Sequence, residues 1–206
     1  MSDIWDRVYG KDSSFFGEEP SRFATLCYEH MKRYDVNELL ELGCGQGRDC
    51  IFFASKGIAV KTLDHSKIAI DGVAERAKVH ALPVTAMVYD ARTGFPYKDQ
   101  EFDAVYSHMF FSMNFTSAEL KFLFSEVRRV LKPNGFHFFS VRSDKDRFYG
   151  KGRQIADGIY DVNGFQIRFF SRREIMDLIL GFDLEQIMED TEDPASLYLV
   201  FCRRKK

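Results

Sequence analysis

The sequence predicts an α/β fold in which a mostly parallel sheet carries helices on both faces. Apolar segments of strand length alternate with amphipathic segments of helix length, and this alternation is typical of a parallel sheet. A glycine-rich turn at residues 43–47 joins the first apolar segment to a helix. The last two strand segments, 182–188 and 196–202, are separated by only seven residues, which suits an antiparallel hairpin and not a crossover helix.

The N-terminal part of the chain begins this alternation. Residues 20–34 form a helix candidate before the first strand, which is the apolar segment 36–42. The segment after the glycine turn, 49–56, is rich in apolar side chains that suit a packed helix. The elements predicted next are a strand at 58–63, a helix at 67–80 and a strand at 82–89.

The C-terminal part carries the clearest helix signals. A helix at 116–131 begins at a capping box, Thr116 with Glu119, and places its apolar residues on one face. A second capping box, Ser171 with Glu174, predicts the start of another helix. The other predicted features here are strands at 102–108, 182–188 and 196–202, a fifth strand ending at Arg142, and a helix end at Gly181.

The glycine turn indicates a ligand site. Glycines at 43, 45 and 47 let the backbone turn sharply and approach a ligand without interference from Cβ atoms. A dinucleotide fingerprint would place its third glycine one position later than Gly47, and here an acid, Glu41, stands two residues before Gly43. A nucleotide-like cofactor is the first hypothesis, although a tight strand-to-helix turn can also be purely structural.

Four later landmarks follow this turn in order. Asp64 ends the second strand, where a carboxylate can accept both hydroxyl groups of a ribose. Asp90 and Ala91 follow the third strand, and Ser107 and His108 end the fourth. The last landmark is the turn at residues 131–136, Leu-Lys-Pro-Asn-Gly-Phe, which precedes the fifth strand.

Together these landmarks resemble motifs of the class I S-adenosylmethionine-dependent methyltransferases. The resemblance implies S-adenosyl-L-methionine as the cofactor and a seven-stranded Rossmann-like sheet of order 3-2-1-4-5-7-6, its last strand antiparallel. Asn134 stands where that family usually has a glycine, and Asn tolerates a left-handed backbone. The cofactor-binding residues that the resemblance and the turn predict are Trp5, Tyr9, Glu41, Gly43, Cys44, Gly45, Gly47, Arg48, Asp64, His65, Ser66, Asp90, Ala91 and Ser107.

A narrower resemblance rests on the turn and on the N-terminal aromatic residues. Residues 43–49, the glycine-ended helix at Gly57 and the Leu63–Asp64 pair are similar to the small tellurite- and thiopurine-type methyltransferases. The N-terminal W-x-x-x-Y and the following Phe-Phe-Gly at 15–17 are similar to that group too. Those relatives act without a metal on small soft nucleophiles or oxyanions, so the resemblance favours a thiol or oxyanion acceptor and in-line displacement of the methyl group.

The acceptor side is less strongly marked. His108 is a candidate general base, although a histidine at a strand end is more often a structural hydrogen bonder. Arg142 is the second candidate, because a guanidinium can hold an anionic acceptor through forked hydrogen bonds. Three further arginines, Arg147, Arg153 and Arg168, could do the same or could be solvated. The residues that could enclose the sulfonium of the methyl donor are Trp5, Tyr9, Phe15, Phe16 and 109–111.

Composition sets the remaining expectations. A length of 206 residues suits one domain, here divided into a flap and helix (1–35), a cofactor-binding core (36–142) and an acceptor-side loop, helix and hairpin (143–206). A net charge of −2 gives no case for a nucleic-acid or membrane partner, and no metal-ligand spacing occurs. Residues 1–10 do not read as a signal peptide, so we expect a cytoplasmic monomer or homodimer that acts on a small-molecule acceptor.

Two questions stay open at this level. Residues 143–164 are irregular and charged, and they can be read either as a solvated insertion or as ligand-facing loops. A nicotinamide-dependent oxidoreductase would use the same Asp64 carboxylate, although the spacing of the glycines counts against it. A regulatory protein that binds the cofactor without turnover would keep every one of these landmarks.

Overall fold

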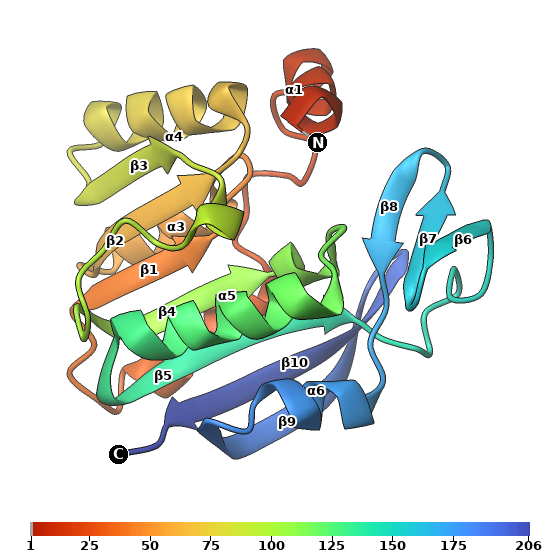
Figure 1. The fold of residues 1–206 in the computed structure, drawn as a ribbon. Coiled ribbons are helices and arrows are strands. Elements are labelled where there is room, and N and C mark those ends of the chain that lie inside the picture. Colours follow the sequence, from red (N-terminus) through yellow and green to blue (C-terminus); the bar gives the residue numbers. More distant parts are fainter. Residues whose placement is uncertain (1) are drawn as a thin grey trace.

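A seven-stranded sheet forms the centre of the protein (Figure 1). The computed structural model describes residues 2–206, so Met1, the first residue of the predicted flap, lies outside the described residues. The order across the sheet is β3-β2-β1-β4-β5-β10-β9, and β10 is antiparallel to both of its neighbours. In that order the strands are Val84–Val88, Ala59–Asp64, Glu38–Leu42, Phe102–His108, Leu131–Arg142, Ala195–Arg204 and Phe182–Glu192.

Helices cover both faces of the sheet, because successive strand side chains point to opposite sides. On one side, Leu39 of β1 packs with α2, α3 and α4. On the other side, Leu40 packs with α5 and α6, which lie in front of the sheet in Figure 1. The helices are α1 (Ser2–Lys11), α2 (Arg22–Met31), α3 (Arg48–Ser55), α4 (Lys67–Val79), α5 (Ser117–Val130) and α6 (Arg172–Leu178).

The predicted fold class, strand order and closing hairpin are confirmed, while several boundaries were wrong. Strands β9 and β10 pair up to Glu192 and Ala195, so the hairpin loop is much shorter than the predicted 189–195. Helix α6 ends at Leu178 with its C-cap at Ile179, before the predicted end at Gly181. Both predicted capping boxes are present, and Asn134 has a φ of 63°, as its left-handed tolerance predicted.

A second, three-stranded antiparallel sheet occupies the region that the sequence left irregular. Its strands are β6 (Arg153–Ala156), β7 (Ile159–Val162) and β8 (Phe165–Arg168). They were missed because each is four residues long, and all four residues of β6 are exposed. In Figure 1 this small sheet stands beyond the carboxyl ends of the parallel strands.

The carboxyl edge of the large sheet is therefore enclosed by two separate segments. Helix α1 covers it from the side of β2 and β3, and the small sheet covers it from the side of β5 (Figure 1). The two segments meet where the rings of Trp5 and Phe165 lie 5.6 Å apart, centroid to centroid. Open α/β sheets bind ligands at this edge, so a ligand site is expected here.

Candidate functional site

A cavity of about 540 Å³ lies at the carboxyl edge of the parallel strands. Every predicted cofactor-binding residue lines it except Ser107, and so do both acceptor-side candidates, His108 and Arg142. Ser107 is fully buried, and its hydroxyl group has no hydrogen-bond partner among the described residues. The structure thus brings into one cavity side chains that are more than 130 positions apart in the sequence.

The glycine turn forms one wall of this cavity. Gly43 has a φ of 69°, and a Cβ atom there would lie 2.6 Å from Cδ2 of Phe110. Gly45 has a φ of 50°, and its Cβ would lie 2.8 Å from the hydroxyl oxygen of Tyr9. Both positions therefore need glycine for their backbone conformation and for their close approach to neighbouring side chains.

Asp64 holds the turn in place from the end of β2. Its Oδ2 accepts a hydrogen bond from the Gly45 N–H, and its Oδ1 accepts one from the Ser66 N–H, each at 2.8 Å. Burial raises the pKa of Asp64, and these backbone hydrogen bonds act against that rise. Each carboxylate oxygen keeps a second lone pair, so this side chain can still accept from a ligand.

A family comparison identifies what kind of domain this is. Residues 39–135, which hold the glycine turn, Asp64 and Asp90, match the family model described as a methyltransferase domain. Residues 39–135 form a methyltransferase domain of the class I S-adenosylmethionine-dependent type. The resemblance drawn from the sequence is confirmed at this level, and S-adenosyl-L-methionine is the methyl donor of the class.

Individual relatives agree with the methyltransferase domain. An uncharacterized methyltransferase of Synechocystis is 34% identical over 119 residues, covering 58% of this chain and 52% of that protein. The chain spans about half or less of the length of the curated relatives it matches. A methyltransferase structure from Methanosarcina mazei has a TM-score of 0.76 at 20% identity, covering 86% of this chain and 97% of that one.

The structure of TehB from Haemophilus influenzae is also similar in fold. Its TM-score is 0.68 at 16% identity, and the match covers 88% of this chain and 62% of TehB. At such identities a structural likeness shows the fold alone. The narrower resemblance to the small tellurite- and thiopurine-type enzymes therefore stays a prediction.

The residues that line the cavity fit an adenosine-bearing sulfonium. Glu41 is buried, its Oε2 has no hydrogen-bond partner among the described residues, and burial and the nearby Asp49 raise its pKa. Trp5 and Tyr9 stack at 5.4 Å on the flap side of the cavity, and burial also raises the pKa of Tyr9. A buried unpaired oxygen and stacked aromatic rings are features that such a ligand would satisfy.

The adenosine end is expected near Asp90. Its Oδ1 accepts a hydrogen bond from the Arg92 N–H at 3.0 Å, and its Oδ2 lies 3.9 Å from Nε2 of His65. The Asp90 and His65 side chains are 39% and 45% exposed, so both remain accessible to a ligand. Asp64 ends β2 and Asp90 follows β3, so the two carboxylates lie near neighbouring strand ends. That they bind the sugar and the purine stays a prediction.

His108, at the end of β4, is fully engaged with the protein. Its Nδ1 lies 2.7 Å from the Ser140 hydroxyl oxygen, and its Nε2 lies 2.8 Å from Oε2 of Glu192. The Ser140 oxygen also accepts from the Met109 N–H. A carboxylate can only accept, so Nε2 of His108 donates to Glu192, and with Ser140 at Nδ1 neither ring nitrogen is left for a ligand.

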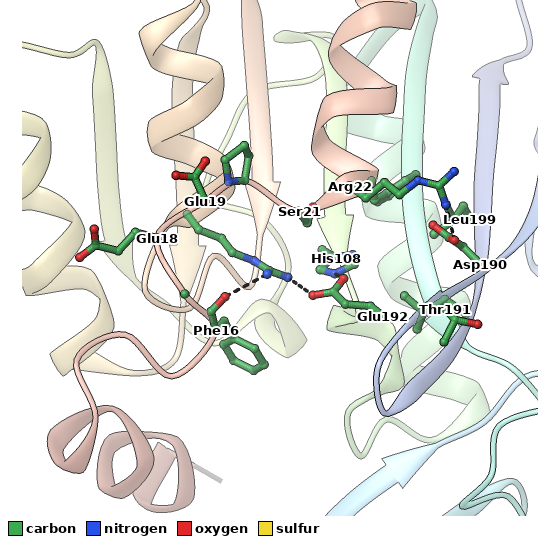
Figure 2. A pocket seen from close by; sticks show the side chains of 15 residues that line it. Phe16, Glu18, Glu19, Ser21, Arg22, His108, Asp190, Thr191, Glu192 and Leu199 are labelled. Carbon is green, nitrogen blue, oxygen red and sulfur yellow. Dashed lines mark hydrogen bonds and ion pairs between the residues drawn. The ribbon is translucent and has the colours of Figure 1, made fainter.

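Glu192 is a site residue that sequence reasoning missed. It lies at the end of β9 and accepts hydrogen bonds from His108 at 2.8 Å and from Arg48 at 2.5 Å (Figure 2). Arg48 also donates to the carbonyl oxygen of Phe16 at 3.0 Å, which ties the flap to the β9–β10 hairpin. This wall separates the main cavity from a second one of about 310 Å³.

The four candidate arginines fall into different places. Arg142 lines the main cavity, whereas Arg147, Arg153 and Arg168 do not. The buried Arg168 donates to the carbonyl oxygens of Phe115 and Asp157, so its role is structural.

Two kinds of feature are absent from the described residues, a cluster of metal ligands and a membrane-spanning helix. Within residues 2–206, no group of three or more His, Cys, Asp or Glu side chains is arranged to hold a metal ion. In the same part of the chain, no helix is long and apolar enough to cross a membrane.

Proposed function

We propose that this protein transfers a methyl group from S-adenosyl-L-methionine to a small-molecule acceptor, with a thiol or an oxyanion favoured. One observation carries the proposal: a single cavity joins the glycine turn, Asp64 and Asp90 at one end to His108 and Arg142 at the other. A donor site and an acceptor site in contact are what a group transfer requires. We further propose that residues 1–206 act as one unit, as a cytoplasmic monomer or homodimer.

The bound donor would supply an electrophilic methyl group, and the protein would supply alignment. Well-oriented reactants gain about 7–11 kcal/mol relative to free ones, so positioning alone can account for much of the catalysis. Asp64 and Asp90 would hold the sugar and the purine. The flap, with Trp5, Tyr9 and Phe16 in mutual ring contact, would exclude water from the reacting atoms.

A general base is not part of the proposal. Both nitrogens of His108 are engaged with Ser140 and Glu192, so the imidazole orients the wall of the site and does not face an acceptor with a free lone pair. A thiolate or an oxyanion is already deprotonated and needs no protein base. This agrees with the acceptor classes that the sequence favours.

The proposal is tested in two steps. Calorimetric titration with S-adenosylhomocysteine and with NADH distinguishes a methyltransferase site from a nicotinamide site. We expect S-adenosylhomocysteine to bind and NADH not to bind. Methyl transfer is then measured against a panel of thiols, oxyanions and small amines. Binding of S-adenosylhomocysteine without turnover on any class would favour a regulatory role, and binding of NADH alone would overturn the proposal.

A further inference from the structure

The guanidinium of Arg142 is fixed in position by groups that leave its outer end unused. Its Nε donates to Oδ2 of Asp146 at 2.7 Å, and its Cζ lies 5.6 Å from the ring centroid of Phe169 and 5.8 Å from that of Phe148. The backbone N–H of Arg142 donates to the Ser112 hydroxyl oxygen at 2.7 Å. Four contacts therefore hold the side chain and its backbone.

Asp146 is itself rigidly held. Its side chain is fully buried, and it also accepts hydrogen bonds from the backbone N–H groups of Ser196 at 2.8 Å and of Phe148 at 2.9 Å. Asp146 therefore acts as a support for Arg142 from outside the cavity. Asp146 and Phe148 belong to the region 143–164, which the sequence left open between a solvated insertion and ligand-facing loops.

The guanidinium still has donors to offer. Asp146 uses Nε alone, and Nη2 of Arg142 is buried without a hydrogen-bond partner among the described residues. A guanidinium has five N–H donors, and leaving a buried charged donor unpaired is costly. The Arg142 side chain as a whole is 12% exposed, so an anion in the cavity could reach the part of the guanidinium that remains accessible.

Arg142 lies at the end of the cavity away from the adenosine-binding residues. It ends β5, whereas Asp64 ends β2, and β1 and β4 lie between these strands in the sheet. At about 4.8 Å per strand, this places the two strand ends about 14 Å apart. The cavity that Arg142 lines is also bordered by apolar side chains, which include Phe110, Phe115, Phe165 and Ile167.

From this arrangement we propose that Arg142 binds an anionic group of the acceptor, and that the acceptor is a small organic anion with an apolar or aromatic body. The inference rests on the proposed function, because it names the acceptor for that same site. The anion would take the unused guanidinium donors, and the apolar body would pack against the phenylalanine rings. Glu192, which also lines the cavity, does not compete for Arg142, because it is already paired with Arg48 and His108.

Binding of two matched probes tests the proposal without any need for turnover. Benzoate and the neutral benzamide are titrated into the protein saturated with S-adenosylhomocysteine. Binding is followed by calorimetric heat and by the fluorescence of Trp5, which is the single tryptophan and lines the cavity. We expect benzoate to bind at least about tenfold more tightly than benzamide. The Arg142→Gln variant should lose this preference, while Arg142→Lys should keep part of it because the charge remains without the fork.

The control variant is Arg153→Gln, which removes an arginine whose side chain is 80% exposed and which does not line the cavity. It should preserve the preference for benzoate, and thermal unfolding shows whether each variant is folded. Equal binding of the two probes by the natural protein would overturn the proposal. So would a loss of S-adenosylhomocysteine affinity in Arg142→Gln, because the anion would then belong to the donor. If S-adenosylhomocysteine does not bind at all, the proposed function fails, and the two probes can still be compared on the protein alone.

Discussion

The carboxylate of Glu192 accepts a hydrogen bond from the imidazole of His108 across 2.8 Å, and this contact joins the end of β9 to the end of β4. Burial acts to raise the pKa of Glu192, but the hydrogen bonds and charges of His108 and Arg48 outweigh it and lower the pKa to about 2. Glu192 is therefore a fixed anion at neutral pH. It keeps Arg48 and His108 in place along the wall between the two cavities.

Replacing Glu192 by Gln is expected to change how stability depends on pH. The pKa of Glu192 is lower in the folded protein than the ordinary value of 4.5, so its stabilising effect is complete above that value and is lost as the pH falls toward 2. Because the side chain is 34% exposed, we expect a loss of only about 1 kcal/mol at pH 7. Urea unfolding from pH 7 to pH 2.5 should show the difference between the two proteins shrinking.

The matched control for this experiment is Glu75→Gln on the exposed face of α4, which should leave the curve unchanged. A difference between Glu192→Gln and the natural protein that stays constant over the whole pH range would show that the carboxylate is not held as an anion by its neighbours.

Replacing Asp64 by Ala is expected to weaken binding of S-adenosylhomocysteine. The substitution removes the proposed acceptor for the ribose and also the two hydrogen bonds that hold Gly45 and Ser66. We expect a loss of about 1–3 kcal/mol, the scale for hydrogen bonds to a charged group, and calorimetry measures it directly. Asp71→Ala serves as the control, because Asp71 pairs with Lys67 on the exposed surface of α4. An unchanged dissociation constant in Asp64→Ala would mean that the ribose lies elsewhere.

The core of this site could be predicted from the sequence because its signals are local. The glycine turn, Asp64 and the capping box of Thr116 are each set by residues within a few positions of one another. Their order along the chain then fixes the topology, since parallel strands bring all their carboxyl ends to one edge. The flap residues Trp5 and Tyr9 were found in the same way, although the helix that carries them was not.

Glu192 and the small sheet lack such signals. The partners of Glu192 are His108 and Arg48, which are 84 and 144 positions away, so no spacing in the sequence reveals the contact. The sequence treated Glu192 as part of a hairpin loop, where acidic residues are common. Strand β6 is exposed at all four positions, so it has no alternation of polar and apolar residues to detect.

Two glycine substitutions distinguish the effect of backbone strain on stability from the effect of a changed cavity wall on ligand affinity. Gly43→Ala and Gly57→Ala both place a side chain at a positive φ, of 69° and 88°, and each should cost about 1 kcal/mol or more of stability. Only at Gly43 does the new Cβ meet a cavity residue, at 2.6 Å from Phe110, whereas nothing lies within 4 Å at Gly57. We therefore expect Gly43→Ala alone to lower the affinity for S-adenosylhomocysteine, by about tenfold or 1.4 kcal/mol. Equal affinities in the two variants would show that Phe110 moves aside freely.

A final prediction concerns His137, which is fully buried in β5 with both ring nitrogens unpaired among the described residues. Its neighbours include the rings of Phe124, Phe139 and Phe182, at centroid distances of 5.2, 4.7 and 5.4 Å. Burial lowers the pKa of His137 from 6.5 to about 3. Between these values the unfolded chain binds a proton that the folded protein refuses, so stability must fall as the pH drops from 6.5 to 3.

The size of that loss is on the order of 4 kcal/mol, because each pKa unit corresponds to about 1.4 kcal/mol. The His137→Leu variant has no group to protonate at this position. We therefore expect the slope of its unfolding free energy against pH, measured in urea, to be smaller than that of the natural protein by the equivalent of up to one bound proton in this window. The control is His80→Leu, at the exposed end of α4, which should keep the slope of the natural protein. If His137→Leu keeps that slope as well, the imidazole must take up its proton in the folded protein as readily as in the unfolded chain. The phenylalanine cluster would then have to admit water or a charged partner to this position.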